Sequence, residues 1–235
     1  MTTADEVGDE PAELRVVQSE RVHDGLVWDV RRDEVELGDG QTVTREVLVH
    51  TGAVGVVALD AEERLLLVRQ YRHPVRSYLW EPPAGLLDVS GEDPWAAARR
   101  ELAEEAHLRA DQWHVLVDFY NSPGGSTEAF RCYLAQGLSE VPENDRHEGE
   151  GEERDMRTEW LRLDAARDLV LAGRLHNPTA VTGILAACAA RDAGWSTLRP
   201  ADAPWPQQSP GRGPARLGPR GRCAVGAPTD VPNSR

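Results

Sequence analysis

Residues 84–108, AGLLDVSGEDPWAAARRELAEEAHL, decide the fold because a glycine-led loop runs directly into a strongly helical segment. Asp93 followed by Pro94 is typical of a helix start, since the aspartate side chain caps free amides and proline has no amide proton to leave unpaired. The run WAAARRELAEEA that begins at Trp95 has high helix propensity. The stretch therefore predicts a loop followed by a helix that ends near His107.

Three carboxylates, Glu101, Glu104 and Glu105, lie within one turn of this predicted helix and share a face. Like charges at this spacing destabilise an isolated helix by about 0.2–0.5 kcal/mol per pair. Because that penalty is small, a solvated acidic helix face is one interpretation. A cation site is the other, since Mg²⁺ prefers oxygen ligands and is commonly held by a few carboxylates together with waters and substrate phosphates.

The residues around the carboxylates favour the cation site. Gly85 leads the loop, Glu92 follows, and Arg100 opens the sequence Arg-Glu-Leu-Ala-Glu-Glu. This order resembles the Nudix hydrolase box, whose core is Arg-Glu-apolar-x-Glu-Glu, and the core is complete here. Two departures stand out: six residues rather than five separate Gly85 from Glu92, and His107 replaces a glycine. A loop absorbs one extra residue at little entropic cost, and histidine tolerates the left-handed backbone of a helix end.

The resemblance implies an α/β fold, a Nudix-type α/β/α sandwich with a mixed sheet. It also implies a magnesium site, or a manganese site, in which Glu101 and Glu105 are the main ligands. The Ala84 carbonyl would join them and Glu104 would assist. Arg100 and Glu92 are expected to form an internal ion pair that fixes the loop to the helix. The implied reaction is hydrolysis of a nucleoside diphosphate linked to another group, with water attacking phosphorus in line.

Four further segments resemble the ADP-ribose pyrophosphatase branch of this family, and Pro123 lies fifteen residues after Leu108, where the branch is known for a proline. The segments are TREV (44–47), VRQYRHP (68–74), LWEPPAGLL (79–87) and NSPGGSTE (121–128). This resemblance covers residues 14–195 and implies cleavage of ADP-ribose to AMP and ribose 5-phosphate. The substrate-binding residues that it implies are Arg45, Glu46, Arg72, Leu86, Ser122, Pro123, Gly124 and Glu128.

Some of these positions have simpler interpretations. In this branch Arg45 and Glu46 would come from the partner subunit of a homodimer with exchanged N-terminal β units, yet they are also suitable cross-strand surface charges. Arg72 is equally interpretable as a strand-edge cation.

The catalytic base in this branch comes from an acidic loop, here HEGEGEERDM at residues 147–156. Glu153 matches best, Glu152 is the neighbouring candidate, and Glu105 would contribute to catalysis through the metal. A solvated run of charges is the alternative interpretation of this loop.

Periodicity and composition divide the chain into four parts. Residues 1–12 are a polar lead-in without periodicity, and residues 13–50 form a small antiparallel β unit with a turn at GDGQ. Residues 51–198 alternate predicted strands and helices and form the Nudix domain. Residues 199–235 are rich in proline, glycine and arginine and are predicted as a disordered tail.

The formal charge of −14 over 235 residues argues against nucleic acid or an anionic membrane as a partner, because both require a basic face. No apolar run approaches the ~18 residues of a membrane span, and the acidic N-terminus is unlike a signal peptide. The three cysteines, Cys132, Cys188 and Cys223, are odd in number and lack metal-ligand spacing. A reducing compartment, the cytoplasm, is therefore expected.

Two rival functions remain open. A pyrophosphatase for another substrate, such as a nucleotide sugar, is compatible with the motifs, whereas NADH is disfavoured because no zinc-ribbon cysteines precede the box. A catalytically silent sensor with this fold is the second rival. The intact Arg-Glu-apolar-x-Glu-Glu motif argues against a sensor. The only feature that favours a sensor is His107 in place of the glycine.

Overall fold

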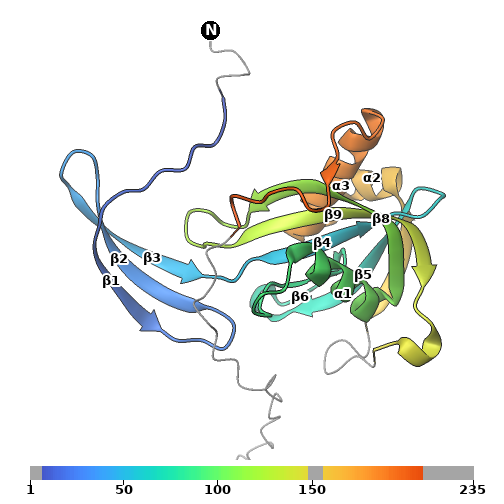
Figure 1. Cartoon of the computed structure of the whole chain (residues 1–235), viewed down its shortest axis with the longest axis horizontal. Helices are drawn as coiled ribbons and strands as arrows, with labels where there is room; N and C mark the ends of the chain where they lie inside the picture. Colours follow the sequence, from blue (N-terminus) through green and yellow to red (C-terminus); the bar gives the residue numbers. More distant parts are fainter. Residues whose placement is uncertain (1–6, 148–155, 209–235) are drawn as a thin grey trace, which may run out of the picture.

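The computed structural model describes residues 7–147 and 156–208, in which a small N-terminal sheet stands apart from a larger body (Figure 1). The small sheet is antiparallel in the order β1-β2-β3. Its strands are β1 (Val16–His23), β2 (Asp29–Glu36) and β3 (Thr42–Val49). The predicted N-terminal antiparallel unit is thus confirmed, with β1 as an additional strand that the alternating runs did not indicate.

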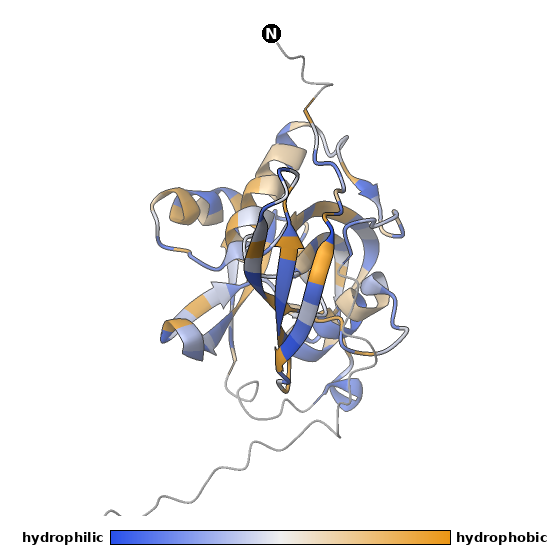
Figure 2. Ribbon diagram, turned by 90° about the vertical axis from the view of Figure 1, so that its left-hand side faces the viewer, coloured by the Kyte–Doolittle hydropathy of each residue, from blue (hydrophilic) through white to orange (hydrophobic). Residues whose placement is uncertain are grey.

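Strand β1 is exposed along its whole length, including the valines at positions 16, 17 and 22. The β1–β2 turn adds exposed Leu26 and Trp28. Figure 2, in which this sheet faces the viewer, shows hydrophobic positions among hydrophilic ones on its strands. The N-terminal sheet therefore presents apolar surface that the body of the same chain does not cover.

The body contains two sheets joined through the turn at Asp60–Arg64. One has the order β11-β8-β9-β4-β7 and the other β10-β5-β6. The strands of the first are β11 (Arg199–Pro200), β8 (Leu108–Tyr120), β9 (Ala129–Glu140), β4 (Ala53–Ala58) and β7 (Ala84–Leu86). Those of the second are β10 (Arg157–Arg162), β5 (Arg64–Arg72) and β6 (Ser77–Glu81). Strands β4 and β5 form no ladder with each other beyond the isolated bridge Leu59–Leu65, so the predicted pair of buried strands separates into different sheets.

The first sheet is mixed, because β4 runs parallel to β9 and antiparallel to β7. Its two faces carry separate cores, as the two-residue period of a strand requires. Val56 of β4 and Tyr133 of β9 pack with helix α1 (Pro94–Ala106). Their neighbours Val57 and Leu134 pack with helices α2 (Leu163–Leu171) and α3 (Pro178–Asp192). Helices on both faces of a mixed sheet confirm the predicted α/β/α sandwich.

The segment 199–208 departs from the predicted tail, which was expected to begin at residue 199. Strand β11 pairs with β8, and the Arg131 side chain, which is only 2% exposed, donates to the Ala203 and Pro204 carbonyls at 2.7 and 3.1 Å. The Trp205 ring lies 4.7 Å from the Arg131 guanidinium carbon. The boundary was wrong for these residues because their backbone carbonyls satisfy a buried guanidinium, which composition does not reveal.

Across the two described ranges, no helix combines the length and the apolar character needed to cross a lipid bilayer. Short 3₁₀ turns occur at His73–Val75 and Glu143–Asp145. The second turn comes just before the acidic loop predicted at residues 147–156, and residues 148–155 of that loop fall outside the described ranges.

Candidate active site

Helix α1 has the start and the end that its sequence predicts. The Asp93 carboxylate accepts hydrogen bonds from the amides of Trp95 and Ala96, at 2.9 and 3.3 Å. His107 ends the helix in the left-handed conformation, with φ of 53°, and its amide bonds to the Leu102 carbonyl. Because Leu102 is fully buried against the sheet, the carboxylates on the other side of the helix are directed away from the core.

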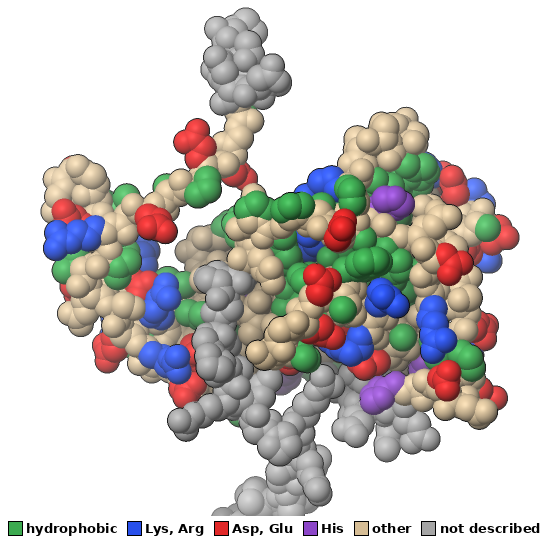
Figure 3. Space-filling view, in the orientation of Figure 1, with side chains coloured by type: hydrophobic (Ala, Val, Ile, Leu, Met, Phe, Trp, Pro, Cys, Tyr) green, Lys and Arg blue, Asp and Glu red, His purple; other side chains and the backbone are tan. Residues whose placement is uncertain are grey.

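Arg100 gathers the carboxylates of the site around one guanidinium. It pairs with Glu92 in a bidentate manner, with both N···O distances at 3.0 Å, which confirms the predicted loop-to-helix ion pair. The same guanidinium lies 2.6 Å from Glu101 and 3.2 Å from Glu104. The hydrogen bond to Glu92 is the main cause that raises the pKa of Arg100. Figure 3 shows acidic and basic side chains side by side over the face that carries α1.

Glu101 is more enclosed than Glu104, with 13% of its side chain exposed against 29%. Burial raises its pKa, Arg100 opposes that shift, and the charges of Glu104 and Asp88 add to it. Gly85 lies so close that a β-carbon there would collide with the Glu101 carboxylate. The glycine of the loop therefore makes room for the carboxylate of the helix.

Glu105 is held by the backbone of the glycine loop. The Ala84 amide donates to Glu105 Oε2 at 2.9 Å, and Ala84 itself lies opposite Gly55 in the β7–β4 ladder. Leu86 pairs with Ala53 in the same ladder. The sequence predicted a role for the Ala84 carbonyl, whereas the contact described here uses the Ala84 amide. Strand β7 thus connects the loop, the sheet and the helix.

These residues have the chemistry that a hard divalent cation requires. Within residues 7–147 and 156–208, no three or more His, Cys, Asp or Glu side chains are gathered closely enough to hold a metal ion. Arg100 contacts both Glu101 and Glu104. All the donors are carboxylate oxygens, and burial raises the pKa of Glu101 because it disfavours the charged form, with the charges of Glu104 and Asp88 adding to the shift. Carboxylate oxygens are the donors that suit a cation of the Mg²⁺ type.

Arg72, a predicted substrate-binding residue, lies at the end of β5 and is paired with Glu81 at the end of β6. Its Nε donates to Glu81 Oε1 at 2.9 Å, and its Nη2 donates to Oε2 at 2.6 Å. The Arg72 side chain is 42% exposed, whereas that of Glu81 is 3% exposed. Arg72 is therefore more than a strand-edge cation, because it has a buried acidic partner. The sequence did not reveal that partner.

The predicted substrate loop, residues 121–128, connects β8 to β9 and is held by its own backbone. Ser122 has a φ of 54°, and its carbonyl accepts from the amides of Gly125 and Ser126, both at 3.0 Å. Leu48 at the end of β3 donates to the Gly125 carbonyl at 2.8 Å and accepts from the Thr127 amide at 3.0 Å. This loop, which includes Pro123, Gly124 and Glu128, therefore anchors the N-terminal sheet to the body.

Comparison with known proteins agrees with this geometry. The model of the NUDIX domain matches residues 49–180, a range that contains β7, α1 and the loop 121–128. The chain belongs to the NUDIX family. Its glycine loop and α1 are the NUDIX box, with Arg100 at the centre.

Proteins similar to this NUDIX chain include an enzyme and an activator. A Mycobacterium tuberculosis protein named ADP-ribose pyrophosphatase is 44% identical over 193 residues, 82% of this chain and 91% of its own length. A Bacillus methanolicus protein named methanol dehydrogenase activator is 37% identical over 73% of this chain and 91% of its own length. A solved structure described as an ADP compounds hydrolase superposes with a TM-score of 0.66, at 21% identity, over 80% of this chain and 99% of its own, which shows the shared fold.

Arg45 and Glu46 are not brought to the NUDIX box within this chain. Both lie on β3 in the outlying sheet, where Glu46 accepts from Arg32 Nη2 at 2.8 Å and Arg45 Nη1 donates to the Thr44 carbonyl at 3.0 Å. Figure 1 shows this sheet at a distance from α1. Glu152 and Glu153, the predicted base and its neighbour, lie outside the described residues.

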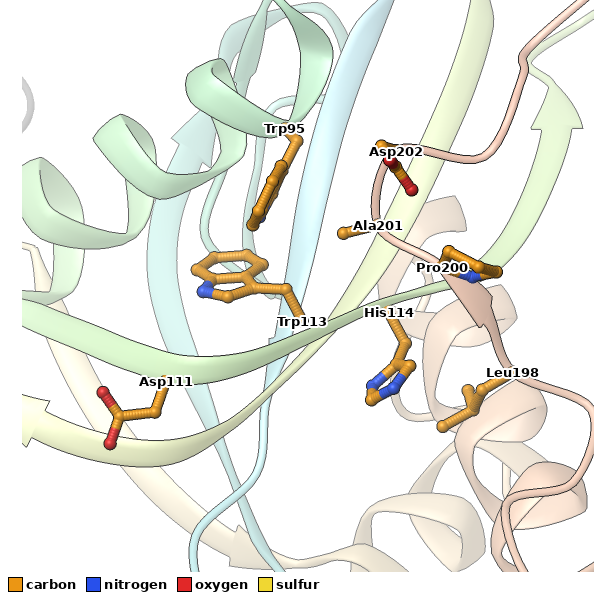
Figure 4. Close-up of a pocket in the computed structure, with 8 residues that line it drawn as sticks. All are labelled: Trp95, Asp111, Trp113, His114, Leu198, Pro200, Ala201 and Asp202. Carbon is orange, nitrogen blue, oxygen red and sulfur yellow. The ribbon is translucent and has the colours of Figure 1, made fainter.

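Two described hollows of the body lie beside the NUDIX box. One of about 560 Å³ lies between the start of α1, β8 and the segment 198–202, with Trp95, Trp113 and His114 along it (Figure 4). Its described lining contains none of the predicted site residues. Another, of about 570 Å³, is lined by Tyr120, Arg199 and Pro123, the last from the predicted substrate loop.

Proposed function

We propose that this NUDIX protein is a divalent-metal-dependent hydrolase that cleaves ADP-ribose to AMP and ribose 5-phosphate. One observation carries the proposal: a complete box, with Glu101 and Glu104 paired with Arg100 and Glu105 held by the Ala84 amide, lies in a chain that is 44% identical over 193 residues to the mycobacterial ADP-ribose pyrophosphatase. A nucleoside diphosphate is the matching substrate class, because crowded carboxylates bind a diphosphate only through a cation.

The box carboxylates would hold Mg²⁺, or Mn²⁺, with Glu101 and Glu105 as main ligands, Glu104 assisting and the Ala84 carbonyl completing the set. When bound, the cation supplies Lewis-acid stabilisation of the phosphoryl oxygens and lowers the pKa of the attacking water. Arg100 and Glu92 keep the loop and helix in register. Glu153, or its neighbour Glu152, would accept the proton of that water as general base.

Substrate would be oriented by Arg72, Leu86 and the loop that contains Ser122, Pro123, Gly124 and Glu128. The Arg72 guanidinium matches the geometry of a phosphate. The β7 backbone at Leu86 borders the box through its ladder with β4. The rigid hydrogen bonding of the loop supports a role in positioning rather than in proton transfer.

Arg45 and Glu46 would complete the site of a partner subunit in a homodimer. Two observations support this arrangement. The outlying sheet carries exposed Val16, Val17 and Val22, and the β1–β2 turn adds exposed Leu26. Apolar surface of this kind, on a sheet that the described part of the chain leaves exposed, is typical of an interface.

The cytoplasm is the proposed compartment, and neither nucleic acid nor membrane is a proposed partner, because the net charge is −14. Cys132 and Cys188 are free thiols buried in the body, which supports a reducing environment.

Incubation of the purified protein with ADP-ribose, NADH, ADP-glucose and GDP-mannose, with and without Mg²⁺ or Mn²⁺, tests the proposal. AMP is expected from ADP-ribose only when a divalent ion is present. Glu105→Gln should reduce kcat/KM by about 100-fold or more, since it removes a metal ligand. Glu62→Gln, at an exposed glutamate of the Asp60–Arg64 turn, is the control. Release of GMP from GDP-mannose without AMP from ADP-ribose would identify the nucleotide-sugar alternative.

A further inference from the structure

Glu81 is a buried acid next to the NUDIX box to which the proposed reaction gives no role. It ends β6 and is 3% exposed, yet its only cationic partner in the described contacts is Arg72. The Arg72 Nε lies 2.9 and 3.2 Å from the two carboxylate oxygens, and Nη2 lies 2.6 Å from Oε2. One complete edge of the guanidinium is therefore held by one buried carboxylate.

The pair lies on the α1 side of the β5–β6 ladder. Glu81 is opposite Val68, and side chains two residues apart on a strand share a face, so Leu66 and Arg72 lie on the same side. Leu66 packs with the buried residues of α1, whereas Trp80 packs with the core on the other face. The register thus directs both Glu81 and Arg72 toward the box.

Glu81 is also connected to the box through the chain. Pro82 and Pro83 follow it and fix the backbone torsions that lead to Ala84. The Ala84 amide holds Glu105, and the Pro83 carbonyl accepts from the Val56 amide at 2.8 Å. A rigid path of three residues therefore joins the carboxylate that holds Arg72 to the backbone that holds Glu105.

We propose that Glu81 is a positioning residue that acts through Arg72, orienting its guanidinium for the diphosphate of the substrate. This inference rests on the proposed function. A guanidinium is planar with donors in a fixed fork, so a carboxylate bound along the Nε–Nη2 edge sets the plane of the whole group. The buried Glu81 carboxylate holds one edge of the Arg72 guanidinium, whose side chain is 42% exposed, and this reduces the conformational entropy that Arg72 loses on binding a phosphate.

A purely structural ion pair predicts a different outcome. Loss of a buried pair lowers stability, but it leaves KM and kcat of the folded molecules unchanged. A positioning role predicts a change in substrate affinity that depends on Arg72. The two roles are separated by kinetics on folded protein and by a double-mutant comparison.

The test uses Glu81→Gln, which keeps the shape of the side chain and removes its charge. With the substrate that the wild-type protein hydrolyses, KM should rise about tenfold and kcat should fall less than threefold, because a charge-assisted contact is weakened. Glu81→Asp, which restores the charge, should recover part of the affinity. The double variant Arg72→Gln/Glu81→Gln removes both charges and so leaves no unpaired charge in the interior. Its KM should equal that of Arg72→Gln. If Glu81→Gln does not fold, comparison of the double variant with Arg72→Gln still tests the effect of Glu81 on KM.

Asp164→Asn is the control for loss of an ion pair on other elements, since Asp164, which is 48% exposed, pairs with Arg191 at 2.8 Å between α2 and α3. It should change Tm only slightly and leave KM unchanged. An unchanged KM in Glu81→Gln would overturn the inference. So would a rise in KM on adding Glu81→Gln to Arg72→Gln that is as large as the rise in the wild-type background.

Binding of ADP, measured by calorimetry, separates this inference from the proposed function. Weaker ADP binding by Glu81→Gln in a protein that hydrolyses none of the substrates would reject the function and support the positioning role. Equal ADP binding by wild type and variant would reject the positioning role even if ADP-ribose is hydrolysed. Absence of ADP binding by the wild-type protein would reject both.

Discussion

Glu101 lies against Gly85, in space that a β-carbon at residue 85 would occupy. The contact joins the loop and the helix of the NUDIX box, and Arg100 pairs with the same carboxylate at 2.6 Å. Glycine at this position is therefore required by close approach of a side chain rather than by an unusual backbone angle.

Gly85→Ala should damage the site more than the fold. The added methyl displaces the end of the Glu101 side chain, and misplacement of a catalytic group by about 1 Å reduces rate by about 100-fold. We expect kcat/KM to fall by that order while Tm changes by only a few degrees. Gly38→Ala is the control, because a β-carbon at residue 38 meets no atom within 4 Å. Unchanged kinetics in Gly85→Ala would contradict the described contact.

The stability of the metal-free protein should fall as Glu101 ionises. Burial raises the pKa of Glu101 above its ordinary value of 4.5, so the folded state binds this proton more tightly than the unfolded chain does. The associated stabilisation is present below pH 4.5 and is lost as the pH rises through the raised pKa. Thermal unfolding of wild type and Glu101→Gln should be measured at several pH values. As the pH rises, the Tm of the variant should increase relative to that of the wild type. A pH-independent difference would contradict this expectation.

Arg100→Ala should destabilise the fold because it leaves Glu92, Glu101 and Glu104 without their shared cation. We expect a loss of about 2 kcal/mol in the free energy of unfolding, less than for a fully buried pair because the arginine is partly solvated. Urea denaturation measures it. Mg²⁺ should recover more stability in the variant than in the wild type. Arg99→Ala, which removes an exposed arginine next to Trp95, is the control and should change stability by less than about 1 kcal/mol.

A chain that ends at residue 208 should retain the Tm of the full chain, whereas one that ends at residue 198 should be less stable. The shorter chain loses the Ala203 and Pro204 carbonyls and the Trp205 ring, all of which contact the buried Arg131. Arg131 keeps its pair with Asp118, at 2.8 and 2.9 Å, so a loss of about 2 kcal/mol is expected for the missing hydrogen bonds. Equal melting temperatures for the two truncated chains would show that the segment 199–208 adds no stability.

Val17→Glu should weaken the proposed homodimer. Val17 is 51% exposed on β1, and a charge placed in an apolar interface opposes association. Light scattering should report a dimer for the wild-type protein and a larger monomer fraction for the variant. Gln18→Glu adds the same charge at the next residue of β1 and should leave the dimer intact. A wild-type protein that is monomeric at all concentrations would reject the dimer.

The elements of the box were predictable because their signals are local. Asp93 caps the helix through amides two and three residues away, and Arg100 reaches Glu92 across a loop of the same segment. His107 takes the left-handed conformation that a helix end requires. The Arg72–Glu81 pair and the packing of Arg131 were not predictable in this way. Their partners depend on strand register and on a proline-rich segment whose composition resembles a tail.

By itself, the sequence determined that this chain contains a helix with three aligned carboxylates behind a glycine loop, since capping, helix propensity and residue spacing act over a few residues. Tertiary structure alone decided which of those carboxylates is enclosed, which guanidinium is held and where the packed chain extends past residue 198. Those properties depend on burial and on contacts between strands far apart in the sequence, and both arise only when the two faces of the sheet are covered.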